Sequence, residues 1–323
     1  MTPAGPVGRF APSPTGPLHL GSALAALAAW ASIRRHGGTF VLRVEDLDGP
    51  RVVSGATDAQ LDGLRWLGLD WDQGPDIGGP AGPYRQSERS AHYEAALRHV
   101  AAAGRLFACR RSRRDLAALA SAPHGPDGLP PYPAAWRASP LASGDLAAVH
   151  DAALRFCVTA TETVWTDRIV GPQRENVAET VGDIVLKRRD GVFAYQLAVV
   201  VDDLAMGVTE VVRGADLLDS TARQIQLIEA LGGRVPSYAH VPLVVAPDGA
   251  KLSKRDGALS LDALRAAGIA PEAVIGWLGW ALGQTDAPAL STPAEVAAAF
   301  RIDRVRPQPV VVPETLAEFL LGL

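Results

Sequence analysis

The sequence predicts an α/β protein built on a doubly wound parallel sheet. Short apolar runs at residues 7–10 and 39–44 alternate with helical patterns at residues 57–67 and 87–103, which is the rhythm of parallel strands connected by helices. The first run ends in a proline-rich loop, residues 11–17, where neither strand nor helix can continue. In such a sheet the carboxyl ends of the strands are expected to hold the chemistry.

The first helix is predicted to begin near Leu20. It carries apolar residues on every side, so we expect it to lie against the sheet rather than on the surface. The strand at residues 39–44 follows and ends in Glu45 and Asp46. Two carboxylates are therefore placed at a strand end.

From about Leu106 the alternation fails. A segment rich in proline and glycine, residues 122–133, leads to a strand-like run at residues 153–158, and we interpret this part as an insertion. Later patterns are expected to complete the sheet and then to become short and helical. They comprise strands at residues 184–189, 208–213 and 241–245, a helix at residues 220–231, and helical segments beyond residue 259.

These patterns predict a divided catalytic domain. Its first half covers residues 1–105, an inserted subdomain covers residues 106–180, and its second half covers residues 181–245. Residues 246–323 are expected to form a loop and a small helical unit.

Composition favours a globular protein without a membrane span. Hydrophobic residues make up 48% and charged residues 20%, and a net charge of -4 argues against a protein that holds nucleic acid by its overall charge. Only Cys109 and Cys157 are present, too few for a disulfide framework, and no signal peptide is visible. We expect a cytoplasmic monomer, with Cys157 buried as a small apolar residue.

A first candidate phosphate site is His-Leu-Gly-Ser at residues 19–22. It stands where a loop passes into a helix, so free backbone N–H groups and the helix dipole favour an anion. His19 can donate to phosphate oxygens, and Gly21 leaves room for a phosphate or a flat ring to approach the backbone. The alternative interpretation is an ordinary helix start.

A second candidate is Lys-Leu-Ser-Lys-Arg at residues 251–255. It follows the turn Pro-Asp-Gly at residues 247–249, so we expect a loop that carries three cations. Cations on phosphoryl oxygens stabilise the charge that develops when pyrophosphate leaves. The alternative is a solvated charged turn.

Taken together, the two motifs resemble the signatures of class I aminoacyl-tRNA synthetases of the glutamyl type, which have a Rossmann-like fold. Residues 8–16, Gly-Arg-Phe-Ala-Pro-Ser-Pro-Thr-Gly, and residues 19–22 resemble the first signature with its glutamate-specific lead-in. Residues 251–255 resemble the second signature, with Leu252 for the usual Met and Arg255 for the final Ser. The resemblance implies activation of glutamate with ATP and Mg²⁺.

The resemblance also implies residue roles. Arg9 would clamp the side-chain carboxylate of glutamate with paired hydrogen bonds, and Glu45 would meet its ammonium group. The other residues implied to bind glutamate are Ala11, Ser13, Tyr195 and Arg213. The residues implied to bind ATP are His19, Gly21, Ser22 and Lys254, and the catalytic groups are His19, Lys251 and Lys254. Alternatives are an Arg9–Glu45 structural salt bridge, a core aromatic at Tyr195 and a surface charge at Arg213.

Two features resemble the shorter branch of the family, the glutamyl-queuosine tRNA(Asp) synthetases. Val199 stands where full-length glutamyl enzymes carry Asn, and only 68 residues, 256–323, follow Arg255, so we expect no anticodon-binding domain. That branch implies a glutamyl-adenylate formed without tRNA and glutamate transferred to the queuosine base at the anticodon wobble position of tRNA(Asp). Local arginines are then expected to contact phosphates of the RNA; they are Arg110, Arg111, Arg113 and Arg114.

Three alternatives remain open at this point. A glutamyl-tRNA synthetase would charge the 3′ end of tRNA(Glu), which the expected lack of an anticodon-binding domain disfavours. Another adenylyl- or cytidylyltransferase would share residues 19–22 but not residues 9–13 or 251–255. A catalytically inactive RNA-binding paralogue would have no need of both phosphate motifs.

A zinc site common in relatives is predicted to be dismantled here. Cys109 remains, but Arg111 replaces the second thiolate, and Tyr132 is followed by Trp136 where the last cysteine would fall. One thiolate and one phenol cannot build a closed tetrahedral site. We therefore expect no zinc, with Cys109 and Tyr132 as remnants.

Overall fold

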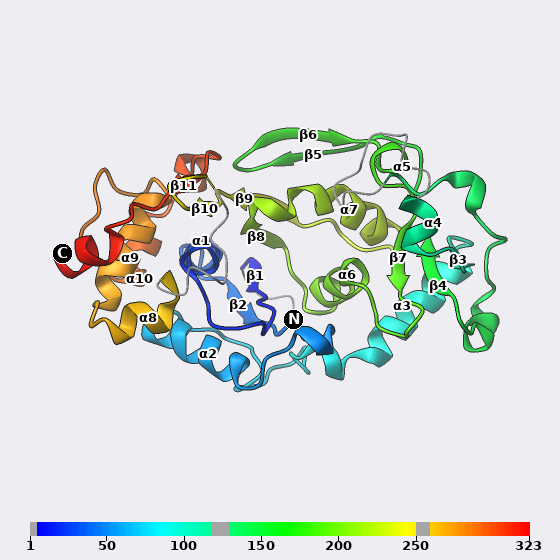
Figure 1. Ribbon diagram of the computed structural model, residues 1–323, viewed down its shortest axis with the longest axis horizontal. Helices are drawn as coiled ribbons and strands as arrows, with labels where there is room; N and C mark the ends of the chain where they lie inside the picture. Colours follow the sequence, from blue (N-terminus) through cyan, green and yellow to red (C-terminus); the bar gives the residue numbers. More distant parts are fainter. Residues whose placement is uncertain (1–4, 118–129, 250–258) are drawn as a thin grey trace.

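The computed structural model describes residues 5–117, 130–249 and 259–323. The molecule is elongated: a six-stranded sheet lies at its centre, a three-stranded sheet at one end, and the C-terminal helices at the other (Figure 1). None of the helices within these ranges is long and apolar enough to cross a membrane.

The central sheet confirms the predicted fold class. Its order is β2-β1-β8-β9-β5-β6, and every neighbouring pair is parallel except β5 and β6. Its strands are β1 (Val7–Phe10), β2 (Thr39–Leu42), β8 (Glu210–Gly214), β9 (Ser237–Val241), β5 (Thr163–Asp167) and β6 (Gly171–Glu175). Because β1 lies between β2 and β8, the strand order reverses there, and a ligand crevice is expected at the carboxyl ends of β1 and β8.

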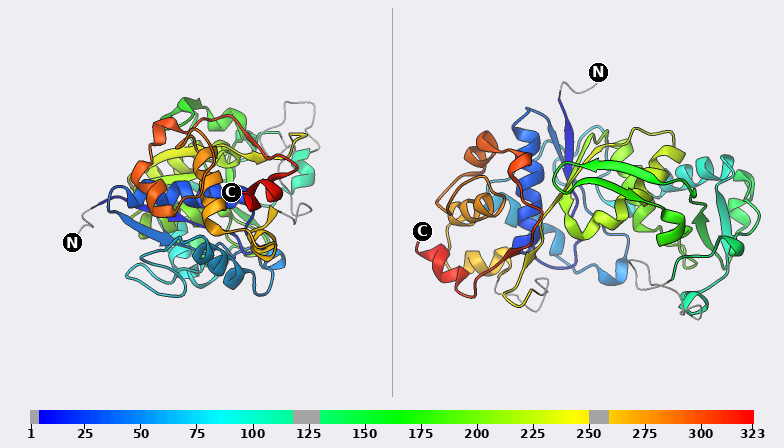
Figure 2. Two further views of the ribbon diagram at one scale, coloured as in Figure 1. Left: turned by 90° about the vertical axis from the view of Figure 1, so that its left-hand side faces the viewer. Right: turned by 90° about the horizontal axis from the view of Figure 1, so that it is seen from above.

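Helix α1 (Leu20–Arg34) is buried along its length, as predicted. Twelve of its 15 residues are buried, because one side packs on β1 and β8 and the other on α9 and α10. Figure 2 shows α1 between the sheet and the C-terminal helices. Three further helices accompany the sheet: α2 (Ala56–Trp66), α6 (Tyr195–Ala205) and α7 (Thr221–Ala230). Residues 57–67 and 220–231 are therefore helical as expected.

The strand predicted at residues 184–189 does not complete the central sheet, which corrects the expectation. As β7 (Ile184–Lys187) it pairs antiparallel with β4 (Ala153–Phe156), which pairs with β3 (Leu106–Cys109). The burial of β7 explains why it belongs to an antiparallel sheet. Buried and partly exposed residues alternate along the strand, as in an antiparallel sheet with only one face covered. Helix α3 (Ser90–Ala102) packs in the same apolar cluster.

Conversely, β5 and β6 come from the predicted insertion but extend the central sheet, since Asp167 pairs with Tyr238 of β9. The domain limits themselves stay a prediction.

The strand expected at residues 241–245 is interrupted at Pro242, whose backbone has no N–H group to donate to a neighbouring strand. The chain continues as β10 (Val244–Val245), which pairs with β11 (Val310–Val311).

The C-terminal part is mostly helical, as expected, and packs on α1. Its helices are α8 (Leu261–Ala266), α9 (Pro271–Ala281), α10 (Pro293–Ala299) and α11 (Leu316–Leu321). A capping box of Thr292 and Glu295 fixes the start of α10. The remaining short elements are η1 (Gly49–Arg51), η2 (Gln86–Glu88), α4 (Arg113–Ala117), η3 (Ala134–Trp136), η4 (Ser143–Ala148), α5 (Val177–Thr180), η5 (Ala215–Ser220) and η7 (Ile302–Arg304).

The packing of α9 yields a stability prediction. A Cβ on Gly276 would lie 1.6 Å from the carbonyl oxygen of Ala289, so Gly276→Ala must push the backbone apart. We expect the free energy of unfolding to fall by about 1–3 kcal/mol or more, measured by urea denaturation. Gly144→Ala is the control, because a Cβ there meets nothing within 4 Å. Equal stability of the two variants would contradict the close approach.

Candidate active site

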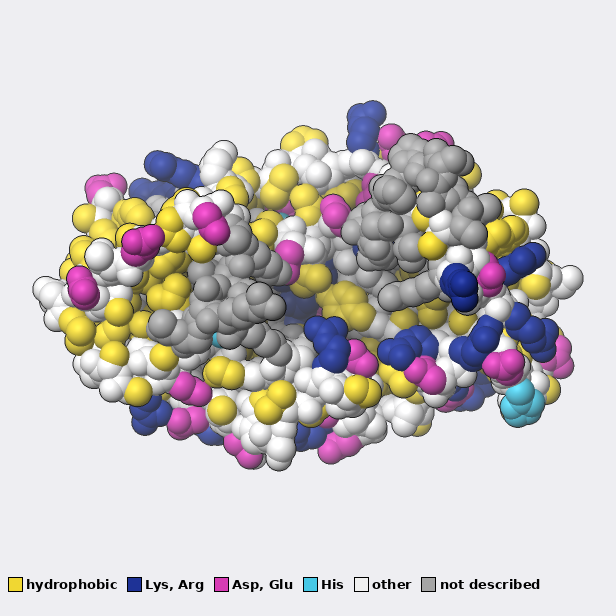
Figure 3. Space-filling view, viewed as in Figure 1, with side chains coloured by type: hydrophobic (Ala, Val, Ile, Leu, Met, Phe, Trp, Pro, Cys, Tyr) yellow, Lys and Arg dark blue, Asp and Glu magenta, His cyan; other side chains and the backbone are white. Residues whose placement is uncertain are grey.

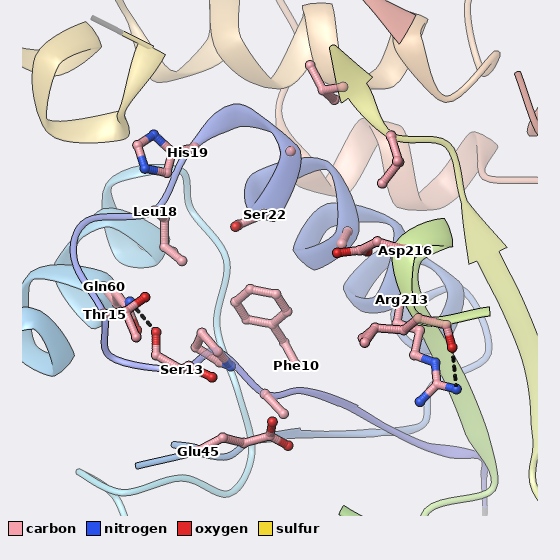
Figure 4. Close-up of a pocket in the computed structure, with 18 of the residues that line it drawn as sticks. Phe10, Ser13, Thr15, Leu18, His19, Ser22, Glu45, Gln60, Arg213 and Asp216 are labelled. Atoms are coloured by element: carbon pink, nitrogen blue, oxygen red, sulfur yellow. Dashed lines mark hydrogen bonds between the residues drawn. The ribbon is translucent and has the colours of Figure 1, made fainter. Parts of the chain in front are cut away.

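A cavity of about 460 Å³ opens at the carboxyl ends of β1 and β8, at the reversal of strand order. It brings together all the predicted site residues that the structure describes. They are Arg9, Ala11, Ser13, His19, Gly21, Ser22, Glu45, Tyr195 and Arg213. Lys251 and Lys254 lie outside the described residues. In Figure 4, His19 and Ser22 lie toward one end of the cavity and Glu45 and Arg213 toward the other.

The N-terminus of α1 forms the first end of the cavity. His19 is the N-cap residue, and its side chain makes no capping hydrogen bond to the helix. Gly21 and Ser22, in the first turn of α1, line the cavity. A Cβ on Gly21 would meet only Val244, at 3.8 Å. Among the described residues, the space beside Gly21 is therefore open enough for a ligand. The positive end of the helix dipole favours an anion at this position.

A buried chain of alternating charges lies beneath the other end. Arg9 Nε donates to Asp203 Oδ2 (3.3 Å), Arg43 Nη1 donates to Asp203 Oδ1 (2.6 Å), and Arg43 Nη2 donates to Glu45 Oε1 (3.0 Å). Arg9 and Glu45 are thus not a direct salt bridge; Asp203 and Arg43 join them. Of the Arg9 nitrogens, only Nε donates to Asp203, and Nη1 also donates to the Val212 carbonyl at 3.5 Å. The remaining N–H groups of Arg9 can serve another carboxylate.

The pKa values follow from this arrangement. Burial would raise the pKa of Asp203, but Arg9 and Arg43 hold it below its usual value. Burial raises the pKa of Glu45, and Arg43 acts in the opposite direction. Asp203 is therefore ionised, whereas the effect of burial on Glu45 outweighs that of Arg43, so the pKa of Glu45 lies above its usual value.

A second carboxylate, Asp202, is held next to this chain. Arg89 Nε (2.6 Å), Gln86 Nε2 (2.8 Å) and Tyr93 OH (3.0 Å) all donate to it. Asp202 lies 3.7 Å from Arg43 Nε. Sequence reasoning missed this support. The available signal was an adjacent pair of aspartates in an otherwise apolar helical stretch, since buried carboxylates require cationic partners.

Arg213 is buried and is not the surface charge that one alternative proposed; only 5% of it is exposed. Its guanidinium donates to His240 Nε2 (3.0 Å), Gln224 Oε1 (2.7 Å), Thr221 Oγ1 (3.0 Å) and the Leu217 carbonyl (3.2 Å). Each of these four acceptors is a neutral group, whereas Arg9 has a carboxylate partner.

Tyr195, the first residue of α6, is half-buried and lines the cavity, so it is not only a core aromatic. Val199, one turn further along α6, is buried in the apolar cluster that α6 forms with α3. It is not among the described residues that line the cavity.

A second cavity, of about 980 Å³, adjoins the first and shares Ser13, Glu45, Arg51 and Tyr195 with it. Its wall carries arginines from both the central part and the three-stranded sheet. They are Arg51, Arg111, Arg155, Arg188 and Arg189. Figure 3 shows Lys and Arg side chains beside the hollow in this face and along the surface that leads from it. Arg110 and Arg114, close in sequence to Arg111, are exposed, and the side chain of Arg113 is not described.

Cys109 and Tyr132, the predicted remnants of a zinc site, lie in a cluster with aromatic side chains. Cys109 Sγ lies 3.3 Å from Tyr132 OH, which donates to the Trp136 carbonyl (3.1 Å). Arg111 lies over the Trp136 ring at 4.9 Å, and Arg155 over the Tyr132 ring at 4.1 Å. The described residues contain no group of three His, Cys, Asp or Glu that could hold a metal. Whether zinc binds stays a prediction. Cys157 is half-buried rather than buried.

The fold and the cavity together define the class of protein. A parallel sheet whose order reverses between β1 and β8, with a helix N-terminus and polar side chains at the carboxyl ends of these strands, is typical of a Rossmann-like nucleotide-binding enzyme.

Comparison with known proteins identifies the family. A model of the catalytic domain of the class I tRNA synthetases (E and Q) matches residues 7–310. The chain therefore belongs to this family and is a ligase of the class I aminoacyl-tRNA synthetase type. It is 50% identical to a glutamyl-Q tRNA(Asp) synthetase of Symbiobacterium thermophilum, over 96% of this chain and 97% of that protein.

Two further comparisons agree. The chain is 53% identical to a glutamyl-Q tRNA(Asp) synthetase of Geobacter sulfurreducens, over 82% of this chain and 80% of that protein. Its structure resembles that of a glutamate tRNA ligase from Elizabethkingia meningosepticum in complex with its amino acid, with a TM-score of 0.85 and 29% identity over 98% of this chain and 68% of that one.

Proposed function

We propose that this protein activates L-glutamate with ATP, without tRNA, and transfers the glutamyl group to the queuosine base at the anticodon wobble position of tRNA(Asp). The observation that carries the proposal is one cavity with an anion-favouring helix N-terminus at one end, and with buried Arg9 and Arg213 and partly buried Glu45 at the other. The names of the two glutamyl-Q tRNA(Asp) synthetases compared above support the choice of acceptor.

The charges in the cavity suit glutamate. Arg9 would hold the side-chain carboxylate through its Nη groups, and Glu45, which accepts a hydrogen bond from Arg43, would also accept hydrogen bonds from the α-ammonium group. Ala11, Ser13, Tyr195 and Arg213 would complete the wall.

ATP would lie along the N-terminus of α1, with its phosphates near His19, Gly21 and Ser22. An oxygen of the glutamate α-carboxylate attacks the α-phosphorus, the new P–O bond forms, and the bond to pyrophosphate breaks. His19 would stabilise the added negative charge. The proposed help of Lys251 and Lys254 rests on the sequence alone.

Magnesium would neutralise phosphate charge when ATP is bound. The described residues provide no carboxylate cluster beside α1, so ATP phosphates and water would supply most of its ligands. The chain's own contribution is to fix the positions of the two substrates.

The second step would use the adjoining cavity. A hydroxyl of queuosine attacks the glutamyl carbonyl, AMP leaves, and an ester forms. A loop base that is splayed out of its stack can enter a pocket of this kind, while Arg51, Arg111, Arg188 and Arg189 would contact phosphates of the RNA.

An ATP–pyrophosphate exchange assay tests the first step. We expect exchange that depends on glutamate and needs no tRNA, with glutamine as the control amino acid, because Arg9 and Arg213 select an anionic side chain. No exchange at high glutamate would overturn the proposal.

A transfer assay tests the acceptor. Radioactive glutamate should become attached to tRNA(Asp) that carries queuosine and not to the same tRNA without it. Charging of the 3′ end of tRNA(Glu) instead would assign the chain the activity named for its structural neighbour, a glutamate tRNA ligase.

A further inference from the structure

A buried relay of two side chains leads to Arg213. Asp167 and His240 are 1% and 0% exposed, and Asp167 Oδ2 lies 2.6 Å from His240 Nδ1. Asp167 ends β5, His240 lies on β9 and Arg213 on β8, so the relay crosses three neighbouring strands toward the cavity. Arg213 and His240 are direct partners in the ladder between β8 and β9.

The bonds of Asp167 fix which ring nitrogen of His240 carries the proton. Asp167 Oδ1 accepts the backbone N–H groups of Ile169 (3.0 Å), Val170 (2.9 Å) and His240 (3.2 Å). Burial alone would raise the pKa of Asp167, but these bonds and the bond from His240 lower it. An ionised carboxylate can only accept, so His240 Nδ1 must be the donor.

The opposite nitrogen must then be an acceptor. Arg213 Nε donates to His240 Nε2 at 3.0 Å, and a guanidinium is always protonated. A proton on Nε2 would point at the N–H of Arg213. Burial lowers the pKa of His240, and Arg213 lowers it further although Asp167 acts against both. The neutral Nδ1–H tautomer is the one that fits.

This arrangement holds Arg213 without neutralising it. The Tyr238 ring stacks on His240 at a centroid distance of 6.3 Å and lies 5.4 Å from the Arg213 guanidinium carbon. The negative charge of Asp167 is kept one imidazole ring away from Arg213. The guanidinium is therefore oriented by neutral acceptors and keeps its attraction for an anionic substrate.

We propose that Asp167 and His240 are positioning residues that aim the Arg213 guanidinium into the glutamate end of the cavity by fixing the Nδ1–H tautomer of His240. The inference rests on the proposed function, in which Arg213 contacts glutamate.

Asp167→Asn is the decisive variant, because its amide oxygen can still accept the backbone N–H groups while its NH₂ group faces His240 Nδ1. The ring must then carry its proton on Nε2, against the N–H of Arg213. We expect the KM for glutamate to rise by about tenfold or more, with the KM for ATP unchanged. An unchanged KM for glutamate in a folded Asp167→Asn protein would overturn the proposal.

A pair of variants at His240 separates positioning from structure. The side-chain oxygen of His240→Gln can reach the position of Nε2 and accept from Arg213, so the KM for glutamate should stay near that of the wild type. His240→Leu removes the acceptor and should raise this KM as Asp167→Asn does. Equal effects of both substitutions would contradict the relay.

Asp183→Asn is the matched control. Asp183 is also buried and also bonded to an arginine, Arg137, but it immediately precedes β7 of the three-stranded sheet and does not line the cavity. Its substitution should leave the KM for glutamate unchanged.

Nitrogen-15 NMR of the wild-type imidazole reads the tautomer directly. We expect protonated Nδ1 and unprotonated Nε2 at His240, and a proton on Nε2 would overturn the relay whatever the kinetics. If the wild type shows no glutamate-dependent exchange, the proposed function fails, and the NMR result still decides the relay.

Discussion

Asp203→Ala is expected to lower the free energy of unfolding by about 3–5 kcal/mol, as is usual when one partner of a buried ion pair is removed. Asp203 is the anion that Arg9 and Arg43 share. The side chains of these arginines are only 5% and 0% exposed, so water compensates poorly for the loss of the carboxylate. Urea denaturation with an unchanged m-value would measure the loss.

Asp62→Ala provides the control for this prediction. Asp62 also pairs with an arginine, Arg265, at 2.7 Å, but 66% of its side chain is exposed. The expected loss is about 0–1 kcal/mol, because water screens a surface pair and replaces it on removal. Similar midpoints for the Asp62 and Asp203 variants would show that the chain from Arg9 to Glu45 does not stabilise the fold.

The sequence predicted the positions of the strands more reliably than it predicted which strands pair with each other. Strand and helix patterns over residues 7–103 appear in the structure where they were expected. The apolar run beginning at Ile184 predicted a strand but not its sheet, because four residues carry no information on which neighbour offers hydrogen bonds. Pro242 was the local signal that residues 241–245 could not form one strand.

In the candidate site, likewise, the residues that line the cavity were predictable, but the residues that support them were not. Arg9, Glu45 and Arg213 were predicted from the resemblance to bind glutamate, and the structure places all three at one cavity. Arg43 and Asp203 were not, because the contact between them joins positions 160 residues apart. Such partners are recognised only when the fold brings them together.

The balance of charge explains why these supporting residues belong to the site. Three cations and three anions lie in the buried network; they are Arg9, Arg43, Arg89, Glu45, Asp202 and Asp203. This network is formally neutral, so it orients side chains without adding net charge. Arg213, held by neutral groups, keeps its positive charge beside this neutral network, which complements the net negative charge of glutamate at neutral pH.

Arg9→Lys is expected to raise the KM for glutamate roughly 10- to 100-fold, since a hydrogen bond between charged groups contributes about 1.5–3 kcal/mol. Lysine keeps the charge that Asp203 needs, so the fold should survive, but an ammonium group cannot bond to Asp203 and clamp a second carboxylate with a planar fork. Pyrophosphate exchange at varied glutamate and fixed ATP measures the change.

Two comparisons make the Arg9 prediction specific. Arg265→Lys alters a surface pair that does not line the cavity and should leave the KM for glutamate unchanged. The KM for ATP should not change in Arg9→Lys, because the phosphates are expected at the N-terminus of α1 and not beside Arg9. A rise in the KM for ATP equal to that for glutamate would mean that Arg9 maintains the whole cavity, and the assignment of the glutamate end to Arg9 would then be wrong.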